Sequence, residues 1–337
     1  MFSPRYLEHR QSPGHPERPE RLAAILDRLQ VETLWHDVVE PEPIDLGLLK
    51  RVHDPGYIEA LRKLPEGYID PDTYWRPATW DIALLAAGGA VKAAQLAVKK
   101  KQPAFALVRP PGHHATRNRA MGFCYLNNAA CAAEWLRTKF DRVAIVDIDL
   151  HHGNGTNDIF HERDDVLYIS AHQWGIFPGT GAASDVGSGK GRGFTINVPL
   201  PGGAGDATFE LLFDRIVEPV LRQYRPGAIA VSLGTDGHYA DRQAVLGAGL
   251  TLSSPGYIGL AKRLLDLGKE LCGGAVVFVL EGGYDLSALS EVVAGTVAAF
   301  EGKEIKTMLN ERRDRDCVGR AAIAAAVKIQ REFWGVD

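Results

Sequence analysis

The sequence alternates short apolar runs with longer segments of helical period, and this alternation restricts the possible folds more than any other feature. The apolar runs are Ala104–Val108, Arg142–Leu150, Asp165–Ser170, Ala228–Leu233 and Ala275–Leu280. The helical segments are Trp80–Lys100, Asn127–Lys139, Asp206–Tyr224, Ser254–Leu271 and Leu286–Phe300. Apolar strands separated by helices are typical of a parallel sheet that is covered on both faces. We therefore predict an α/β fold with a single, mostly parallel, doubly covered sheet.

The composition narrows the class of protein further. The 337 residues are 45% hydrophobic, and the chain contains no repeat, low-complexity segment or Pro/Ser-rich linker, which predicts one compact domain. A formal net charge of -4 and the lack of a long Lys/Arg block argue against binding to nucleic acid. Without a long apolar run or a signal-peptide pattern, we expect no membrane association. Four cysteines without disulfide or CxxC spacing favour the reducing cytoplasm.

Polar residues with chemically useful side chains lie at or directly after the ends of four apolar runs. They are His113 and His114 after the first run, Asp147, Asp149 and His151 at the second, Asp236 after the fourth and Tyr284 after the fifth. Ligands of open parallel sheets bind beyond the carboxyl ends of the strands. Because these strand ends share one edge of the sheet, the sequence predicts a single functional site at that edge.

The segment DIDLHHGNGT predicts a metal site. Side chains in a strand alternate between its two faces, so Asp149 and His151 should point the same way and bind one ion. A catalytic metal usually takes three protein ligands and leaves a position for water, and Asp236 is the natural third ligand. The alternative is that these residues only form hydrogen bonds within the turn. The other polar strand ends nearby make that alternative less favourable.

Two further turns predict catalytic groups. In RPPGHH, His113 and His114 lie on a rigid turn, where a histidine can act as a base or a proton donor. Structural or metal-binding histidines are the alternative. In EGGY, two glycines allow a sharp turn that brings Tyr284 over the site, where a phenol can donate a hydrogen bond to a developing oxyanion. An ordinary packed tyrosine is the alternative for this position.

Taken together, the motifs resemble those of the histone deacetylase superfamily, which includes acetylpolyamine amidohydrolases and acetoin-utilisation proteins and is distantly related to the arginases. The similarity runs from GHPERPERL (Gly14–Leu22) to LEGGYDLSAL (Leu280–Leu289) and includes VHDPGYI, RPPGHHA, MGFCYLNNAA, DIDLHHGNGT, YISAHQ, FPGTG, NVPL, VSLGTD and EGGY. GHPERPERL and the Asn of HHGNG are similar to the class II branch. The resemblance implies an arginase/deacetylase-like fold and a single histone-deacetylase-like catalytic domain over residues 1–337.

The resemblance also implies a role for each catalytic side chain. It makes His114 the general base and His113 its electrostatic and proton-transfer partner. Asp147 would orient His113, and Asn154 would orient His114. Tyr284 would polarise the scissile carbonyl.

Binding sites for substrate and ions follow from the same resemblance. Phe123 and Phe177 would form the walls of a narrow acyl-lysine tunnel, and Gly122 would leave space beside the metal. Asp72, in DPDTYW, resembles the rim aspartate that holds the substrate backbone. The implied metal ligands are Asp149, His151 and Asp236. A structural potassium ion would be bound by main-chain oxygens of Asp147, Asp149, His151 and Ala171 and by the Ser170 hydroxyl.

The implied activity is metal-dependent hydrolysis of an acylated amine, either acetyl-lysine in a peptide or a small acetylated amine, to a carboxylate and a free amine. The ligand set suits one zinc ion and accepts ferrous iron. Arginases carry DxHxD and two manganese ions, whereas Gly153 replaces the carboxylate of the second metal, which argues against a two-metal ureohydrolase.

Several alternatives stay open. An acetylpolyamine amidohydrolase is one, since Glu66, Asp70 and Asp72 make the loop Leu64–Tyr74 acidic and favour a cationic substrate. A non-catalytic acyl-lysine-binding protein is another, although it would not need the tandem histidines or Tyr284. The segment GHYADRQAVLG, which follows Asp236, is longer than its counterpart in class II relatives and is expected to shape the pocket rim. Oligomerisation also stays open.

Overall fold

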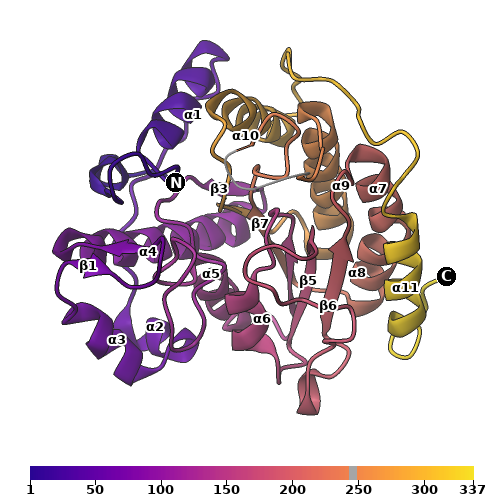
Figure 1. Ribbon diagram of the computed structural model, residues 1–337, viewed down its shortest axis with the longest axis horizontal. Coiled ribbons are helices and arrows are strands. Elements are labelled where there is room, and N and C mark those ends of the chain that lie inside the picture. The colour runs from indigo at the N-terminus through magenta and orange to yellow at the C-terminus, as the bar shows by residue number, and fades with distance from the viewer. Residues whose placement is uncertain (243–248) are drawn as a thin grey trace.

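A six-stranded parallel sheet forms the centre of the fold in the computed structural model, which describes residues 1–242 and 249–337 (Figure 1). The strand order is β3-β8-β7-β4-β5-β6, and every pairing is parallel. The strands are β3 (Ala104–Ala106), β4 (Val143–Asp147), β5 (Val166–Gln173), β6 (Thr195–Leu200), β7 (Ala228–Leu233) and β8 (Val276–Leu280). The predicted α/β class with a mostly parallel sheet is therefore confirmed.

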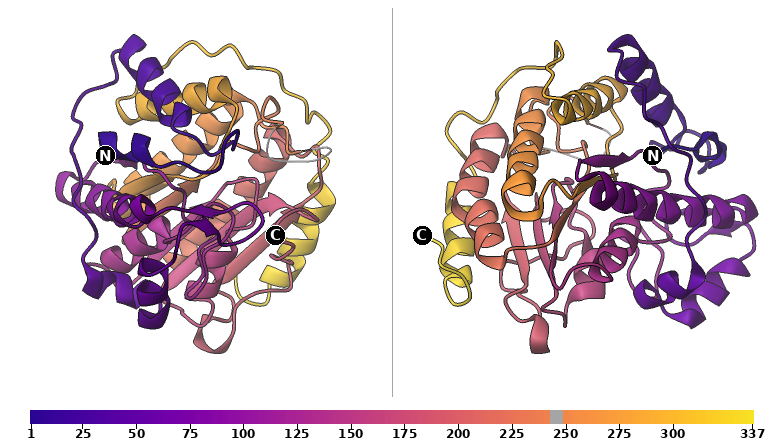
Figure 2. Two further views of the ribbon diagram at one scale, coloured as in Figure 1. Left: turned by 60° about the vertical axis from the view of Figure 1, so that its left-hand side comes forward. Right: turned by 180° about the vertical axis from the view of Figure 1, so that it is seen from behind.

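Helices cover both faces of this sheet (Figures 1 and 2). Helices α4, α5 and α6 pack on one face, and α9 and α11 pack on the other, with α7 and α8 beside them. Helices α1 and α10 pack against each other, and α10 also contacts α9. The bounds are α1 (Glu20–Val31), α2 (Leu46–Val52), α3 (Pro55–Arg62), α4 (Pro77–Lys100), α5 (Asn128–Arg137), α6 (Asn154–Phe160), α7 (Asp206–Leu212), α8 (Glu218–Tyr224), α9 (Ser254–Cys272), α10 (Leu286–Phe300) and α11 (Arg320–Gln330).

The central strands are buried along their whole length because helices cover both faces. Every residue of β4, β5, β7 and β8 is buried, which explains why these strands appear in the sequence as continuous apolar runs. A small antiparallel hairpin of β1 (Gly67–Tyr68) and β2 (Tyr74–Trp75) lies outside the main sheet.

The order of the strands places a switch point between β4 and β7. From β4 the chain winds outwards through β5 and β6, and from β7 it winds the opposite way to β8. Neighbouring strands whose connections leave in opposite directions open a crevice at their carboxyl ends, where α/β proteins bind ligands. The polar residues after β4 and β7 therefore lie at the most favourable place in the sheet for a site.

Two differences from the predicted elements have physical causes. The strand β6 was not predicted, and it contains Pro199, which is tolerated because β6 lies at the edge of the sheet. The segment Asp206–Tyr224 was predicted as one helix but is divided into α7, a π-helical turn (Phe213–Val217) and α8. Pro219 lies just after this turn, where it lacks an N–H for a regular helical hydrogen bond.

Among the described helices, α4 is the one that is long and apolar enough to cross a membrane, and 67% of its most apolar window is buried inside the protein. It contacts β3, β8 and α5, so its apolar surface is used in the interior of the fold.

Candidate active site

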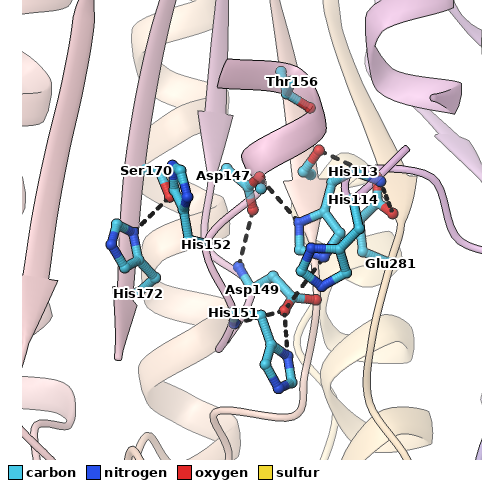
Figure 3. Close-up of polar contacts among 12 residues, drawn as sticks. His113, His114, Asp147, Asp149, His151, His152, Thr156, Ser170, His172 and Glu281 are labelled. Carbon is cyan, nitrogen blue, oxygen red and sulfur yellow. Dashed lines mark hydrogen bonds and ion pairs between the residues drawn. The ribbon is translucent and has the colours of Figure 1, made fainter. Parts of the chain in front are cut away.

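The predicted metal ligands lie together beyond the carboxyl ends of β4 and β7. Figure 3 shows two of them, Asp149 and His151, beside the tandem histidines. Asp149, His151 and Asp236 each offer a ligand atom within 4.8 Å of the others, and no second group of this kind occurs in residues 1–242 and 249–337. The Nδ1 atom of His151 lies 3.1 Å from Asp236 Oδ2 and 3.3 Å from Asp149 Oδ1. Backbone amides of Leu150 and Gly282 donate to the other oxygens of the two aspartates, at 3.0 and 2.9 Å. Backbone amides thus fix the orientation of both carboxylates.

Glycines make room for these carboxylates. A Cβ atom on Gly234 would lie 1.8 Å from Asp149 Oδ2, and one on Gly282 would lie 2.4 Å from Asp236 Oδ2. At Gly153 a Cβ atom would lie 2.2 Å from Asp147 Oδ2, so the structure has no room there for the carboxylate that a second metal ion would need.

The charges within this group favour a bound cation. Burial alone raises the pKa of Asp149, but His113 and His151 hold that pKa far below its usual value. Burial lowers the pKa of His151, yet hydrogen bonds to Asp149 and Asp236 raise it to about 10. Burial and the neighbouring Asp149 raise the pKa of Asp236. Two adjacent carboxylates therefore retain a proton on His151, and a metal ion would bind by displacing that proton.

The tandem histidines meet different partners. His113 Nδ1 donates to Asp147 Oδ2 at 3.2 Å, while His114 Nδ1 donates to Asn154 Oδ1 at 2.8 Å. Tyr168 also donates to Asp147 Oδ2, at 3.0 Å. An amide oxygen can only accept, so the proton of neutral His114 stays on Nδ1 and its Nε2 is left as an acceptor.

The same surroundings separate the pKa values of the two histidines. Burial lowers the pKa of His113, but Asp149 and Asp147 raise it to about 10. Burial holds the pKa of His114 well below its usual value, and the positive charges of His113 and His151 lower it further. Two titratable groups with opposite shifts are the arrangement from which acid and base roles are assigned. His114 is poised to accept a proton, and His113 to carry one.

These groups face a cavity of about 190 Å³. It is lined by Pro16, Asp72, Pro111, His113, His114, Gly122, Phe123, Cys124, Asp149, His151, Phe177, Gly282 and Tyr284. The rings of Phe177 and His114 meet edge to face at 5.0 Å, and those of Phe123 and Tyr284 at 6.0 Å. Gly122 has a positive φ of 56°, and a Cβ atom there would lie 2.6 Å from the His114 ring, so any side chain would narrow the cavity.

Comparison with known proteins decides the family. The histone deacetylase domain matches residues 15–300 of the chain. This chain belongs to the histone deacetylase family. It is 42% identical to a probable deacetylase of Archaeoglobus fulgidus over 346 residues, covering 100% of this chain and 95% of that protein. It is 40% identical to a histone deacetylase-like amidohydrolase of Pseudomonas aeruginosa, covering 80% of this chain and 73% of the relative.

A solved structure supports the same assignment. The HDA15 HD domain superposes with a TM-score of 0.87 at 34% identity, and the match covers 99% of this chain and 96% of that domain. Family and relatives together make the chain a hydrolase of the deacetylase and amidohydrolase type, which acts on acetylated substrates.

Two carboxylates of the acidic loop at the rim of this deacetylase already have partners within the protein. Glu66 pairs with Arg76 at 2.9 Å, and Asp70 accepts hydrogen bonds from the amides of Thr73 and Gly122. Asp72 lines the cavity, and burial and Asp70 raise its pKa to about 6. The charge argument for a cationic substrate therefore depends on Asp72 rather than on the whole loop.

Of the predicted potassium ligands, Asp147 ends β4 and pairs with Ser170 of the adjacent β5, while Asp149 and His151 follow β4. His172 Nε2 donates to the Gly181 carbonyl at 2.9 Å, so its Nδ1 accepts the Ser170 hydroxyl proton, also at 2.9 Å. Ala171 follows on β5 and is buried.

Two carboxylates near the catalytic turns were not singled out from the sequence. Glu281 accepts from the amides of Gly112 and His113, at 2.7 and 3.1 Å, and burial raises its pKa to about 7. Asp241 accepts from the amides of Tyr284 and Asp285. The backbone amides that they accept from belong to distant segments, which no side-chain pattern reveals. Of GHYADRQAVLG, which was expected to shape the rim, residues 243–247 lie outside the described residues.

Proposed function

We propose that this protein is a metal-dependent deacylase that hydrolyses the amide of an acetylated lysine or of a related small acetylated amine. One observation carries the proposal: Asp149 and His151 of the Asp-His-Asp group, two histidines with opposite pKa shifts and a buried tyrosine all line the same narrow cavity, and Asp236 completes the group behind them. The family assignment supports the general activity. We also propose that residues 1–337 form one catalytic domain.

The proposed metal is a single zinc or ferrous ion held by Asp149, His151 and Asp236. Three protein ligands leave a position for a water molecule and for the substrate, as in catalytic rather than structural zinc sites. Two carboxylates and one imidazole accept either ion. When bound, the ion would polarise the substrate carbonyl and make a neighbouring water more acidic. A potassium ion is proposed at Asp147, Asp149, His151, Ser170 and Ala171.

In this proposal the two histidines have different tasks. His114 is neutral, its Nδ1 is held by Asn154, and its Nε2 accepts the proton of the attacking water. His113 stays protonated beside Asp147 and stabilises negative charge in the cavity. After the C–N bond breaks, a protonated histidine delivers a proton to the leaving amine. The products are a carboxylate, typically acetate, and a free amine.

Tyr284 is proposed as the donor to the substrate carbonyl. It lines the cavity and is 4% exposed. Burial, together with the charge of Asp236, raises the pKa of its phenol well above the usual value, so the hydroxyl keeps its proton. A fixed donor aimed at the oxygen that becomes negative stabilises the transition state more than the ground state.

The cavity walls suggest how the substrate enters. Phe123 and Phe177 would flank the aliphatic part of the acyl-lysine, and Gly122 keeps the passage open. Asp72 would hold the substrate from the rim. The position of Asp72 in the lining also favours a second candidate, an acetylpolyamine amidohydrolase, because its carboxylate would attract a cationic tail.

The metal ligands provide the central test. Asp149→Ala and Asp236→Ala should abolish both hydrolysis and stoichiometric metal binding, because two ligands hold a catalytic ion poorly. The measurements are elemental analysis and turnover of acetyl-lysine peptides, acetylpolyamines and longer acyl-lysines by the metal-loaded protein. Full metal content in both variants would contradict the ligand assignment. Peptide binding without turnover by the metal-loaded wild type would instead indicate an acyl-lysine-binding protein.

A further inference from the structure

Asp241 connects the turn after β7 with the turn that carries Tyr284. The residue is 6% exposed, and one carboxylate oxygen, Oδ2, accepts hydrogen bonds from the backbone amides of both Tyr284 and Asp285, the latter at 2.9 Å. A carboxylate that accepts two backbone N–H groups is held more strongly than a neutral acceptor would be.

The turn that presents Asp241 is itself fixed by hydrogen bonds. The amide of Asp241 donates to the His238 carbonyl at 2.9 Å, and the amide of Ala240 donates to His238 Nδ1 at 3.0 Å. His238 is fully buried, and its Nε2 lies 3.3 Å from the Ser254 hydroxyl. The carboxylate of Asp241 therefore projects from a rigid segment.

The backbone on the other side turns sharply just before Tyr284. Tyr284 follows Gly282 and Gly283, and Gly283 has a φ of 116°, which few residues other than glycine adopt. A glycine pair permits the sharp turn but does not by itself fix the direction of the next side chain. Thr235 and Arg21 donate to the carbonyls of Gly282 and Gly283, and Asp285 caps α10 by accepting from the Ala288 amide at 2.9 Å. The amide of Tyr284, between these two points, is held by Asp241.

We propose that Asp241 is a positioning residue that fixes the backbone of Tyr284 and thereby aims its phenol into the cavity. The metal ligand Asp236 and Asp241 lie on the same short turn, so one rigid segment sets the distance between the metal site and the phenol. This proposal rests on the proposed function, because it requires Tyr284 to act on the substrate. Misplacement of a reacting group by about 1 Å can cost on the order of 10² in rate.

The chain offers a matched control in Asp314. This aspartate is 2% exposed, and its carboxylate accepts from the amides of Gly205, Thr208 and Val318, each at 2.9 Å. None of these partners lines the cavity. Asp314→Ala therefore reports the general cost of removing a buried carboxylate that holds backbone amides.

The experiment is a double-mutant cycle with Asp241→Ala and Tyr284→Phe in the metal-loaded full chain. Asp241→Ala should lower kcat by about 10- to 100-fold with little change in KM, and Asp241→Asn, which keeps an acceptor of the same shape, should restore most of it. In the Tyr284→Phe background Asp241→Ala should change kcat less than about twofold, since there is no phenol left to aim. Asp314→Ala should lower Tm and leave kcat near the wild-type value.

Equal losses of kcat in both backgrounds, or no loss in the wild-type background, would overturn the proposal while the role of Tyr284 stands. Wild-type kcat in Tyr284→Phe alone would instead refute the proposed role of the tyrosine. If Asp241→Ala does not fold, the cycle is run with Asp241→Asn, for which a smaller but equally non-additive loss is expected. Failure of both variants to fold would assign Asp241 to stability and reject the positioning role.

Discussion

The adjacent residues His113 and His114 show how much of the chemistry depends on single contacts. Asp149 and Asp147 raise the pKa of His113, whereas burial and the charges of His113 and His151 lower the pKa of His114, so a charged imidazole lies beside a neutral one. The sequence predicted the pair because RPPGHH follows an apolar run. It did not predict Glu281, whose carboxylate accepts from the amides of Gly112 and His113, because backbone donors leave no pattern in the sequence.

At this scale the decisive change is Tyr284→Phe. The ring keeps its shape, so fold and metal content should survive, while the loss of the hydroxyl should lower kcat by about 10²–10³ with a smaller effect on KM. Steady-state kinetics with acetyl-lysine peptide measures the change, with metal content and Tm as controls. Near-wild-type kcat in a folded, metal-loaded variant would mean that Tyr284 only packs against its neighbours.

At the scale of elements, the strands were predicted better than the segment before the sheet. Buried strands form continuous apolar runs, whereas α1 is amphipathic and follows a proline-rich turn. The spacing of Leu22, Ile25 and Leu29 was the available signal for α1, since all three are buried on one face. Helix α1 was not predicted from the sequence, yet it contributes to the site. Its Arg21 donates to the Gly283 carbonyl at 2.6 Å and so contacts the turn before Tyr284.

A buried network of ion pairs joins the segment before α1 to the sheet. We expect that breaking this network lowers the free energy of unfolding. Glu17 pairs with Arg109, after β3, and with Arg21 at 3.3 Å, and all three side chains are fully buried. Glu17→Gln leaves two buried guanidinium groups poorly compensated and should lower the free energy of unfolding by about 3–5 kcal/mol. Urea unfolding measures this loss.

The control for that experiment is Glu332→Gln. Glu332 pairs with Arg192 at 2.7 Å, but both side chains are more than half exposed, so its loss should leave the urea midpoint almost unchanged. Equal shifts in the two variants would show that burial of the Glu17 network contributes nothing beyond a surface ion pair.

For the whole molecule, buried neutral histidines predict how stability depends on pH. His53 is fully buried, donates from Nδ1 to the Thr116 carbonyl at 2.9 Å and accepts from the Asn127 amide at Nε2, also at 2.9 Å. Burial lowers its pKa from 6.5 to about 4. The unfolded chain therefore binds a proton that the folded chain excludes between these pH values, and stability falls as the pH drops through this window.

Full passage through the window should cost about 3 kcal/mol from His53 alone. Urea unfolding at pH 7 and at pH 4.5 measures the loss, and His53→Gln, which does not titrate, should show a smaller difference between the two conditions. An identical pH dependence in both proteins would exclude His53 as a source of the acid sensitivity.

The switch point between β4 and β7 has a consequence for how the chain holds together. Asp149 and His151 belong to the half that winds through β5 and β6, while Asp236 belongs to the half that winds to β8. An ion shared by these residues would link the two halves of the sheet in the folded chain. Because the unfolded chain cannot offer this geometry, ion affinity would add directly to folding stability. The ion proposed for catalysis would then also stabilise the packing of the two halves of the sheet against each other.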